Sequence, residues 1–229
     1  MPEAISRVAM ISGASRGIGA AIAERLGATG WTLSLGMRSP KPVGDALVHA
    51  YEAGSRDAEA EWVAATLARF GRIDALVCNA GISVSKSVVD ATNEDMAAMF
   101  AVNVLAPQRL ARAAWPALTA CGRGRVVIIS SLSGLRVASA ASGAYAMTKF
   151  AATGLAHGLR HAGWDRGIRA TAICPGFVAT DMARAVTDTD PGTMTQPEEV
   201  ARLVELALDL PNNASVAEIG VNWRVEGRL

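Results

Sequence analysis

The chain has 229 residues, a formal net charge of +1 and 51% hydrophobic residues. This length and composition predict a single domain, residues 1–229, with a substantial core. The nearly neutral charge argues against nucleic acid as a partner, and no apolar run is long enough to span a membrane.

Short apolar segments alternate with segments of helical periodicity along the whole chain. We predict strands near 8–11, 32–36, 46–51, 75–78, 126–130, 170–174 and 216–222, and helices near 18–29, 58–70, 93–120, 144–163 and 197–210. This order predicts an α/β fold with a Rossmann-like, doubly wound, parallel seven-stranded sheet and helices on both faces. A helix cap is expected at residues 92–95, and a capping box with an early proline at residues 195–198.

The connection between the second and third predicted strands is unusually short. Only residues 39–45 separate Arg38 from the third strand, and they include Pro40 and Pro42. A parallel crossover usually needs a dozen or more residues, and proline disfavours a helix. We therefore predict that the second crossover helix is shortened or absent.

A glycine-rich turn follows the first predicted strand and opens into a helix. Residues 12–19 have the pattern S-G-x(3)-G-x-G. Glycines allow a tight turn and let the backbone approach a pyrophosphate, whose charge is stabilised at a helix N-terminus. The turn predicts a nucleotide site.

Tyr145 and Lys149 are four residues apart, so they lie on one face of a predicted helix. An isolated tyrosine has a pKa of about 10 and is a poor acid or base at neutral pH. A nearby ammonium is expected to lower that pKa and make the hydroxyl available for proton transfer.

Taken in order, the glycine turn, Asn79-Ala80-Gly81, Ser131, Tyr145-x(3)-Lys149 and Pro175-Gly176 resemble the short-chain dehydrogenase/reductase family over nearly the whole chain. The resemblance implies an NAD(P)-dependent oxidoreductase of class EC 1.1.1.-. It also implies a homodimer or homotetramer, built on the two long helices. The alanine-rich face of the later one, Ala140, Ala141, Ala144, Ala151, Ala152 and Ala156, permits close approach to a twin or to the sheet.

Four residues are the expected catalytic group: Asn103, Ser131, Tyr145 and Lys149. Ser131 is selected because the family's serine usually lies three residues before the glycine that here is Gly134; Ser130 and Ser133 remain alternatives.

The resemblance also implies a set of cofactor-binding residues. They are Gly13, Ser15, Arg16, Gly17, Ile18, Gly19, Arg38, Glu52, Ala53, Asn79, Ala80, Gly81, Tyr145, Lys149, Pro175, Gly176, Val178 and Thr180. The family's NAD-selecting acidic residue is replaced by Met37, followed by Arg38. Two guanidiniums, from Arg16 and Arg38, without a carboxylate favour the 2′-phosphate of NADP, although NAD stays possible.

We expect NADP-dependent reduction of a ketone or aldehyde to an alcohol, with Tyr145 as the general acid. The substrate pocket should include Ser83, Ser133, Phe177 and Met182, and it accepts a small-molecule carbonyl or alcohol. An NAD-dependent alcohol dehydrogenase and a dinucleotide-binding regulatory protein without turnover are the alternatives. No metal is expected, and the pair His157 and His161 lacks an adjacent acidic or cysteine partner.

The scattered cysteines Cys78, Cys121 and Cys174 fit a reducing compartment. The first seven residues do not form a signal peptide, so we expect a cytoplasmic protein.

Overall fold

The computed structural model describes residues 6–55 and 57–225. Residues 1–5, on which most of the signal-peptide expectation rests, lie outside the described residues. Among those described, no helix is both long enough and apolar enough to cross a membrane.

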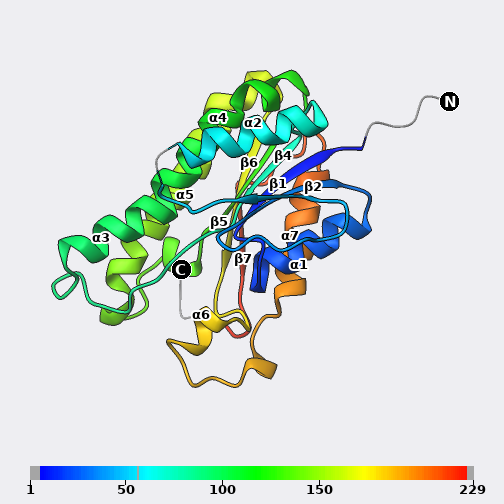
Figure 1. The fold of residues 1–229 in the computed structure, drawn as a ribbon. Coiled ribbons are helices and arrows are strands. Elements are labelled where there is room, and N and C mark those ends of the chain that lie inside the picture. Colours follow the sequence, from blue (N-terminus) through cyan, green and yellow to red (C-terminus); the bar gives the residue numbers. More distant parts are fainter. Residues whose placement is uncertain (1–5, 56, 226–229) are drawn as a thin grey trace.

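One parallel sheet with the strand order β3-β2-β1-β4-β5-β6-β7 forms the centre of the molecule (Figure 1). Its strands are β1 (Val8–Ser12), β2 (Thr32–Met37), β3 (Leu47–Ala50), β4 (Ala75–Cys78), β5 (Arg125–Ile129), β6 (Arg169–Pro175) and β7 (Glu218–Val221). The winding direction reverses between β1 and β4, which pair side by side. In open α/β sheets this reversal creates the crevice where ligands bind.

Helices cover both faces of this sheet. On one face α1 (Gly17–Ala28) packs against α7 (Pro197–Asp209), and the other carries α2 (Ala58–Phe70), α4 (Ala106–Ala120) and α5 (Gly143–Gly163) (Figure 1). Two shorter helices, α3 (Asn93–Phe100) and α6 (Asp181–Arg184), complete the fold. The predicted doubly wound seven-stranded architecture is confirmed.

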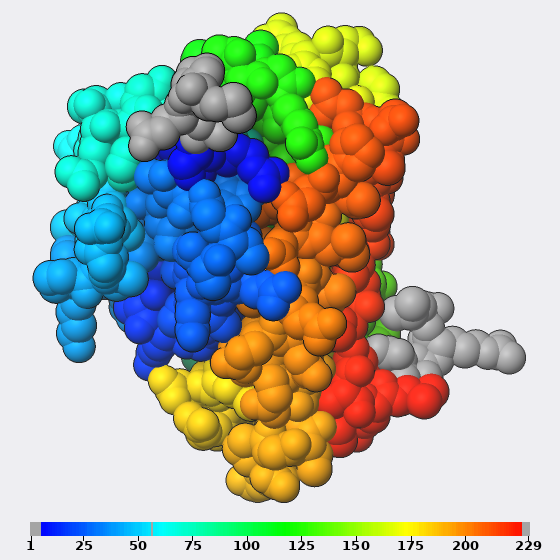
Figure 2. Space-filling view, turned by 90° about the vertical axis from the view of Figure 1, so that its right-hand side faces the viewer, coloured from blue at the N-terminus to red at the C-terminus, as the bar shows by residue number. Residues whose placement is uncertain are grey.

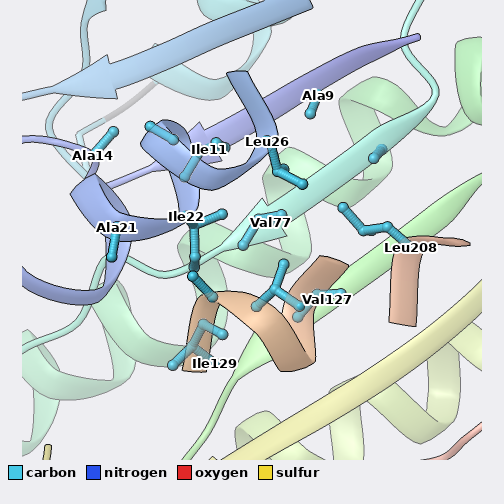
Figure 3. Packing of buried hydrophobic residues seen from close by; sticks show 14 of the residues in the cluster. Ala9, Ile11, Ala14, Ala21, Ile22, Leu26, Val77, Val127, Ile129 and Leu208 are labelled. Atoms are coloured by element: carbon cyan, nitrogen blue, oxygen red, sulfur yellow. The ribbon is translucent and has the colours of Figure 1, made fainter. Parts of the chain in front are cut away.

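The apolar core is divided by the sheet into two layers, as a doubly wound fold requires. On the α1 and α7 side, Ile11, Val77 and Val127 of neighbouring strands meet Ile22 and Leu208 (Figure 3). Because the central strands are covered on both faces, they consist of nearly continuous apolar residues.

The connection from β2 to β3 contains no helix in residues 38–46, all of which are described, as predicted. Despite the short connection, β2 and β3 still pair in parallel, with Ser34 to Met37 of β2 aligned with Leu47 to Ala50 of β3. On the face that carries α2, Trp62 lies against Gly36 and donates its indole N–H to Ser34 Oγ at 2.9 Å. This contact anchors β2 where its crossover has no helix.

The predicted helix 93–120 is interrupted by a π turn, Ala101–Leu105, in which the Ala106 N–H bonds to the Ala101 carbonyl. Pro107 explains the interruption. In a regular helix its ring would clash with the Asn103 carbonyl and could not donate to it. A one-turn π bulge relieves that conflict, and such bulges are common at functional sites.

Two smaller expectations also need correction. The capping box at the start of α7 is formed by Gln196 and Glu199, one residue later than predicted, because Thr195 is buried and pairs with Val178. The cap expected at residues 92–95 is confirmed, and it is a capping box formed by Thr92 and Asp95. The expected alanine face is divided: Ala144, Ala152 and Ala156 of α5 are buried, whereas Ala140 and Ala141 lie in a short 3-10 helix before α5 and are exposed.

Gly36→Ala tests the contact that anchors β2. A Cβ at Gly36 would lie 2.8 Å from Trp62 Cη2, so we expect a loss of about 1–3 kcal/mol in unfolding free energy from overpacking. Urea denaturation measures this loss. Gly158→Ala in α5 is the control, because its Cβ meets no atom within 4 Å and a helical alanine should be neutral or stabilising. Equal stability of the Gly36→Ala variant and the wild type would contradict the tight contact.

Candidate active site

The glycine turn between β1 and α1 is held by backbone geometry that side chains would prevent. Gly13 and Gly17 have φ angles of +68° and +55°. A Cβ on Gly19 would lie 2.2 Å from the Gly13 carbonyl oxygen, so a larger residue there would separate turn and helix. The N–H groups of Gly13 and Ala14 bond to the Gly36 carbonyl, which ties the turn to β2.

The N-terminus of α1 has no side-chain cap and no acidic residue in its first turn. Such an end carries partial positive charge and unsatisfied N–H groups, which suit an anion. Ser15 and Arg16 are exposed beside it, while Ile18 packs against the core. The predicted pyrophosphate-binding residues are therefore brought together.

Asn79 joins this turn to the end of β4. Its amide Nδ2 donates to the carbonyls of Ser12 at 3.0 Å and Gly13 at 3.1 Å. In the opposite direction, Ser12 Oγ accepts the N–H groups of Asn79 and Ala80 at 3.0 and 3.1 Å. Ser12 was not singled out from the sequence, although it stands at the start of the glycine motif.

Gly81 lies between the nucleotide turn and the predicted catalytic residues. A Cβ at this position would be 3.3 Å from Asn103 Oδ1 and 3.7 Å from Lys149 Nζ. The absence of a side chain therefore leaves space next to both polar groups.

Asn103, on the π turn, is only 3% exposed and bonds to residues distant in sequence. Its Oδ1 accepts the Ile82 N–H and its Nδ2 donates to the Ile82 carbonyl, both at 2.9 Å. Nδ2 also donates to Thr148 Oγ1 at 3.0 Å, and that hydroxyl donates to the Tyr145 carbonyl at 2.8 Å. Asn103 thus connects the loop after β4 to the helix turn carrying Tyr145, through a threonine that sequence reasoning missed.

Lys149 is buried in α5, and its Nζ donates to the Ile129 carbonyl at 2.9 Å. Nζ also lies 5.6 Å from the centre of the Tyr145 ring. Burial lowers the pKa of Lys149 to about 8, only partly offset by the nearby Cys174 thiol. The lysine is therefore poised to lose or gain its charge near neutral pH.

Tyr145 differs from expectation. Burial raises its pKa above the usual range, and the hydrogen bond with the Ser131 side chain only partly opposes that shift. The expected lowering of the pKa by Lys149 is not seen, because loss of solvent outweighs the neighbouring polar groups. A raised pKa keeps the phenol protonated at neutral pH.

The three serine candidates after β5 have different surroundings. Ser130 Oγ is buried and bonded to the Lys149 carbonyl at 3.0 Å and to Thr153 Oγ1 at 2.8 Å. Ser131 Oγ accepts the Ser133 N–H at 3.1 Å and interacts with Tyr145. Of the three, Ser131 has the hydroxyl that shares its surroundings with the tyrosine.

The segment after β6 lies against the glycine turn. Thr180 caps α6, and its Cγ2 would be 3.1 Å from a Cβ on Gly17. Val178 is buried and pairs with Thr195, which fixes the base of the segment. Gly176 has no room for a Cβ, because Asn222 Oδ1 would lie 2.1 Å away. Pro175 ends β6 beside it. Of the predicted nicotinamide-side residues, Thr180 is the one that lies against the glycine turn.

At the adenosine end, Arg38 and Glu52 follow β2 and β3 and are exposed, with Ala53 half-buried. Arg16 does not stand free of carboxylates as predicted: its Nη1 lies 2.8 Å from Asp181 Oδ2 at the start of α6. This pairing was missed because the two residues are 165 positions apart.

The predicted substrate residues lie on the three segments that follow β4, β5 and β6. Ser83 follows β4 and Ser133 follows β5, and both are half-buried. Phe177 and Met182 are 37% and 42% exposed, so two apolar side chains face solvent on the segment that approaches the glycine turn. In residues 6–55 and 57–225, no group of three or more histidine, cysteine and acidic side chains could hold a metal ion.

Comparison with known proteins gives a consistent result. A family model described as short chain dehydrogenase matches residues 7–191. An agropine synthesis reductase of Rhizobium rhizogenes is 43% identical over 92% of this chain and 51% of that protein. An acetoacetyl-CoA reductase of Rhizobium meliloti (strain 1021) is 31% identical over 87% of this chain and 90% of that protein. The chain therefore spans about half the length of the agropine synthesis reductase that it matches.

Solved structures show the same fold. A metagenomic short-chain oxidoreductase in complex with NADP has a TM-score of 0.81 at 31% identity, covering 95% of this chain and 97% of that one. An alcohol dehydrogenase from the archaeon Thermococcus sibiricus, complexed with 5-hydroxy-NADP, has a TM-score of 0.86 at 27% identity, covering 97% of this chain and 100% of that one.

Lys149→Met should stabilise the protein at neutral pH. The pKa of Lys149 is lowered from 10.5 in the unfolded chain to about 8 in the fold, so between these values the unfolded state binds more protons. The unfolding free energy of the wild type therefore falls as the pH decreases from 10.5 to 8. Below pH 8 it is reduced by the full cost of burying the charged Lys149 ammonium. We expect the variant to gain on the order of 1–3 kcal/mol at pH 7, and nothing above pH ~10.5.

Thermal unfolding of both proteins across this pH range measures the difference. Lys41→Met, at an exposed position, is the control and should show no pH-dependent gain. A constant difference between Lys149→Met and the wild type from pH 7 to 11 would show that the ammonium is not desolvated.

Proposed function

Because the chain belongs to the short-chain dehydrogenase family, we propose that it is an NADP(H)-dependent oxidoreductase that reduces a ketone or aldehyde to an alcohol. One observation carries the proposal. Tyr145, with its raised pKa, lies beside Ser131 and a buried Lys149 at the same edge of the sheet as the uncapped N-terminus of α1. This arrangement supports the proposal of a proton donor next to a dinucleotide-binding turn.

The residues fit the proposed cofactor. The pyrophosphate would lie at the N-terminus of α1, where glycine backbone approaches closely. Arg16 and Arg38 would bind the 2′-phosphate, and Lys149 the nicotinamide ribose. Two solved relatives of similar fold are complexed with NADP or 5-hydroxy-NADP, which supports NADP over NAD. When bound, the reduced nicotinamide supplies a hydride.

The chain's own residues donate the proton and replace it. The Tyr145 hydroxyl donates to the carbonyl oxygen as that oxygen gains charge, and its raised pKa keeps it protonated until then. The Ser131 hydroxyl orients the same oxygen. Lys149 stabilises the phenolate that remains. Asn103 maintains this arrangement through Thr148, and a water beside Lys149 and Asn103 would return a proton from solvent.

A reductase named for agropine synthesis and an acetoacetyl-CoA reductase are both relatives, so the family comparison supports carbonyl reduction without naming one carbonyl compound. The exposed Phe177 and Met182 favour a substrate with an apolar portion.

Tyr145→Phe should lower kcat for carbonyl reduction by at least about 100-fold, the usual contribution of general acid catalysis, while NADPH binding stays near wild type. Steady-state assays with a panel of ketones and aldehydes measure kcat, and fluorescence titration measures binding. Tyr51→Phe is the matched control, because Tyr51 is the chain's other tyrosine and its hydroxyl bonds to Glu59, which is not one of the proposed catalytic residues. Full turnover by Tyr145→Phe would overturn the mechanism.

Wild-type protein should bind NADPH more tightly than NADH, and Arg38→Met should weaken NADPH binding by about 10- to 100-fold, the value of a charge-assisted bond to phosphate. NADH affinity should change little, because it lacks that phosphate. Fluorescence titration with both cofactors measures this, with Arg112→Met, an exposed arginine on α4, as control.

Three other results would be informative. Tighter binding of NADH by the wild type would favour an NAD-dependent alcohol dehydrogenase. NADPH binding with no turnover of any carbonyl or alcohol would favour a regulatory protein. Failure to bind either cofactor would remove the proposal altogether.

A further inference from the structure

The carboxylate of Asp181 is shared by two arginines. Its Oδ2 accepts a bond from Arg16 Nη1 and its Oδ1 accepts one from Arg184 Nη1, each at 2.8 Å. Arg16 belongs to the glycine turn, whereas Asp181 and Arg184 begin and end α6. The ion pair therefore joins the glycine turn to the segment that follows β6.

The junction is set by backbone packing and not by the ion pair alone. Thr180, immediately before Asp181, lies against Gly17, immediately after Arg16. Figure 2 shows α6 and the residues after it as a yellow and gold lobe below α1 and α7. Asp181 is thus held near Arg16 by its neighbours in the chain.

The ion pair itself is exposed: the side chains of Arg16 and Asp181 are 67% and 56% accessible. Exposed pairs of this kind contribute little free energy, because water screens them. A phosphate accepts charge-assisted hydrogen bonds from a guanidinium as a carboxylate does, and it carries a charge of about −1.5 to −2 and three acceptor oxygens. Arg16 can therefore exchange Asp181 for a phosphate.

We propose that Asp181 is a specificity-determining residue that competes with the 2′-phosphate of NADP(H) for Arg16. This inference rests on the proposed NADP(H)-dependent function. Competition weakens NADP(H) binding and leaves NAD(H), which has no 2′-phosphate, unaffected. Asp181 therefore reduces the preference of the site for NADP(H).

Arg184 moderates the competition. Because it occupies one oxygen of the Asp181 carboxylate, it withdraws part of the negative charge from Arg16. Removal of Arg184 would leave Asp181 to Arg16 alone. The two residues of α6 should therefore affect NADP(H) affinity in opposite directions.

Asp181→Asn should tighten NADPH binding by about two- to fivefold, the range expected when an exposed ion pair is lost. NADH affinity should not change, and Arg184→Met should weaken NADPH binding by a similar factor. Fluorescence titration of purified protein with each cofactor measures these effects. Glu24→Gln, an exposed carboxylate on α1, is the control: it removes the same charge without touching the Arg16–Asp181 pair.

The double variant Arg16→Met/Asp181→Asn decides whether the effect passes through Arg16. We expect its NADPH affinity to equal that of Arg16→Met alone. An equal gain from Asp181→Asn with and without Arg16, or a gain from Glu24→Gln as large, would assign the effect to general electrostatics and overturn the proposal.

Failure of this inference is distinguishable from failure of the proposed function. Wild-type preference for NADPH together with unchanged affinity in Asp181→Asn would refute the role of Asp181 alone. Absence of NADPH binding by the wild type would refute the proposed function first.

Discussion

The close approach of the glycine turn to the end of β4 is the constraint on which the rest of the site depends. Asn79 maintains it by donating to two carbonyls of the turn, and Ser12 returns two bonds to the β4 end. The approach is possible only because Gly19 has no side chain. Two segments that would otherwise be independent loops become one rigid edge, against which the remaining residues are placed.

A continuous series of contacts connects this edge to the proposed catalytic residues. Gly81 leaves room for Asn103 and Lys149, and Asn103 connects the Ile82 backbone to the turn that carries Tyr145. The series includes a π turn imposed by Pro107 and a buried ammonium whose pKa is lowered to about 8. Neither feature favours stability. Their coincidence with the uncapped end of α1 supports a site in which stability has been exchanged for reactivity.

The shortened β2–β3 connection alters the fold without disturbing the site. The glycine turn bonds to Gly36 of β2, so any displacement of β2 would reach the cofactor side directly. Trp62 on Gly36 and the hydrogen bonds among Trp62, Ser34 and Thr66 hold β2 from the opposite face. The contact of Trp62 with β2, on the face that carries α2, thus holds β2 in the absence of a crossover helix on the opposite face. Without that helix, Arg38 and the residues that follow it are exposed.

The order of strands and helices, the missing crossover helix and the family could all be predicted from the amino-acid sequence, because they depend on local periodicity, proline and glycine placement, and motif order. The sequence also indicated Tyr145 and Lys149 as a pair, since an i, i+4 spacing is a local property, and the family resemblance added Ser131 to them. The direction of the Tyr145 pKa shift could not be predicted, since burial depends on what packs around the ring in the folded chain. Likewise, only the tertiary structure decided that Asn103 bonds to Ile82 and Thr148, and that Asp181 meets Arg16. Contacts between residues far apart in the chain follow from the packing of whole elements, which no local pattern specifies.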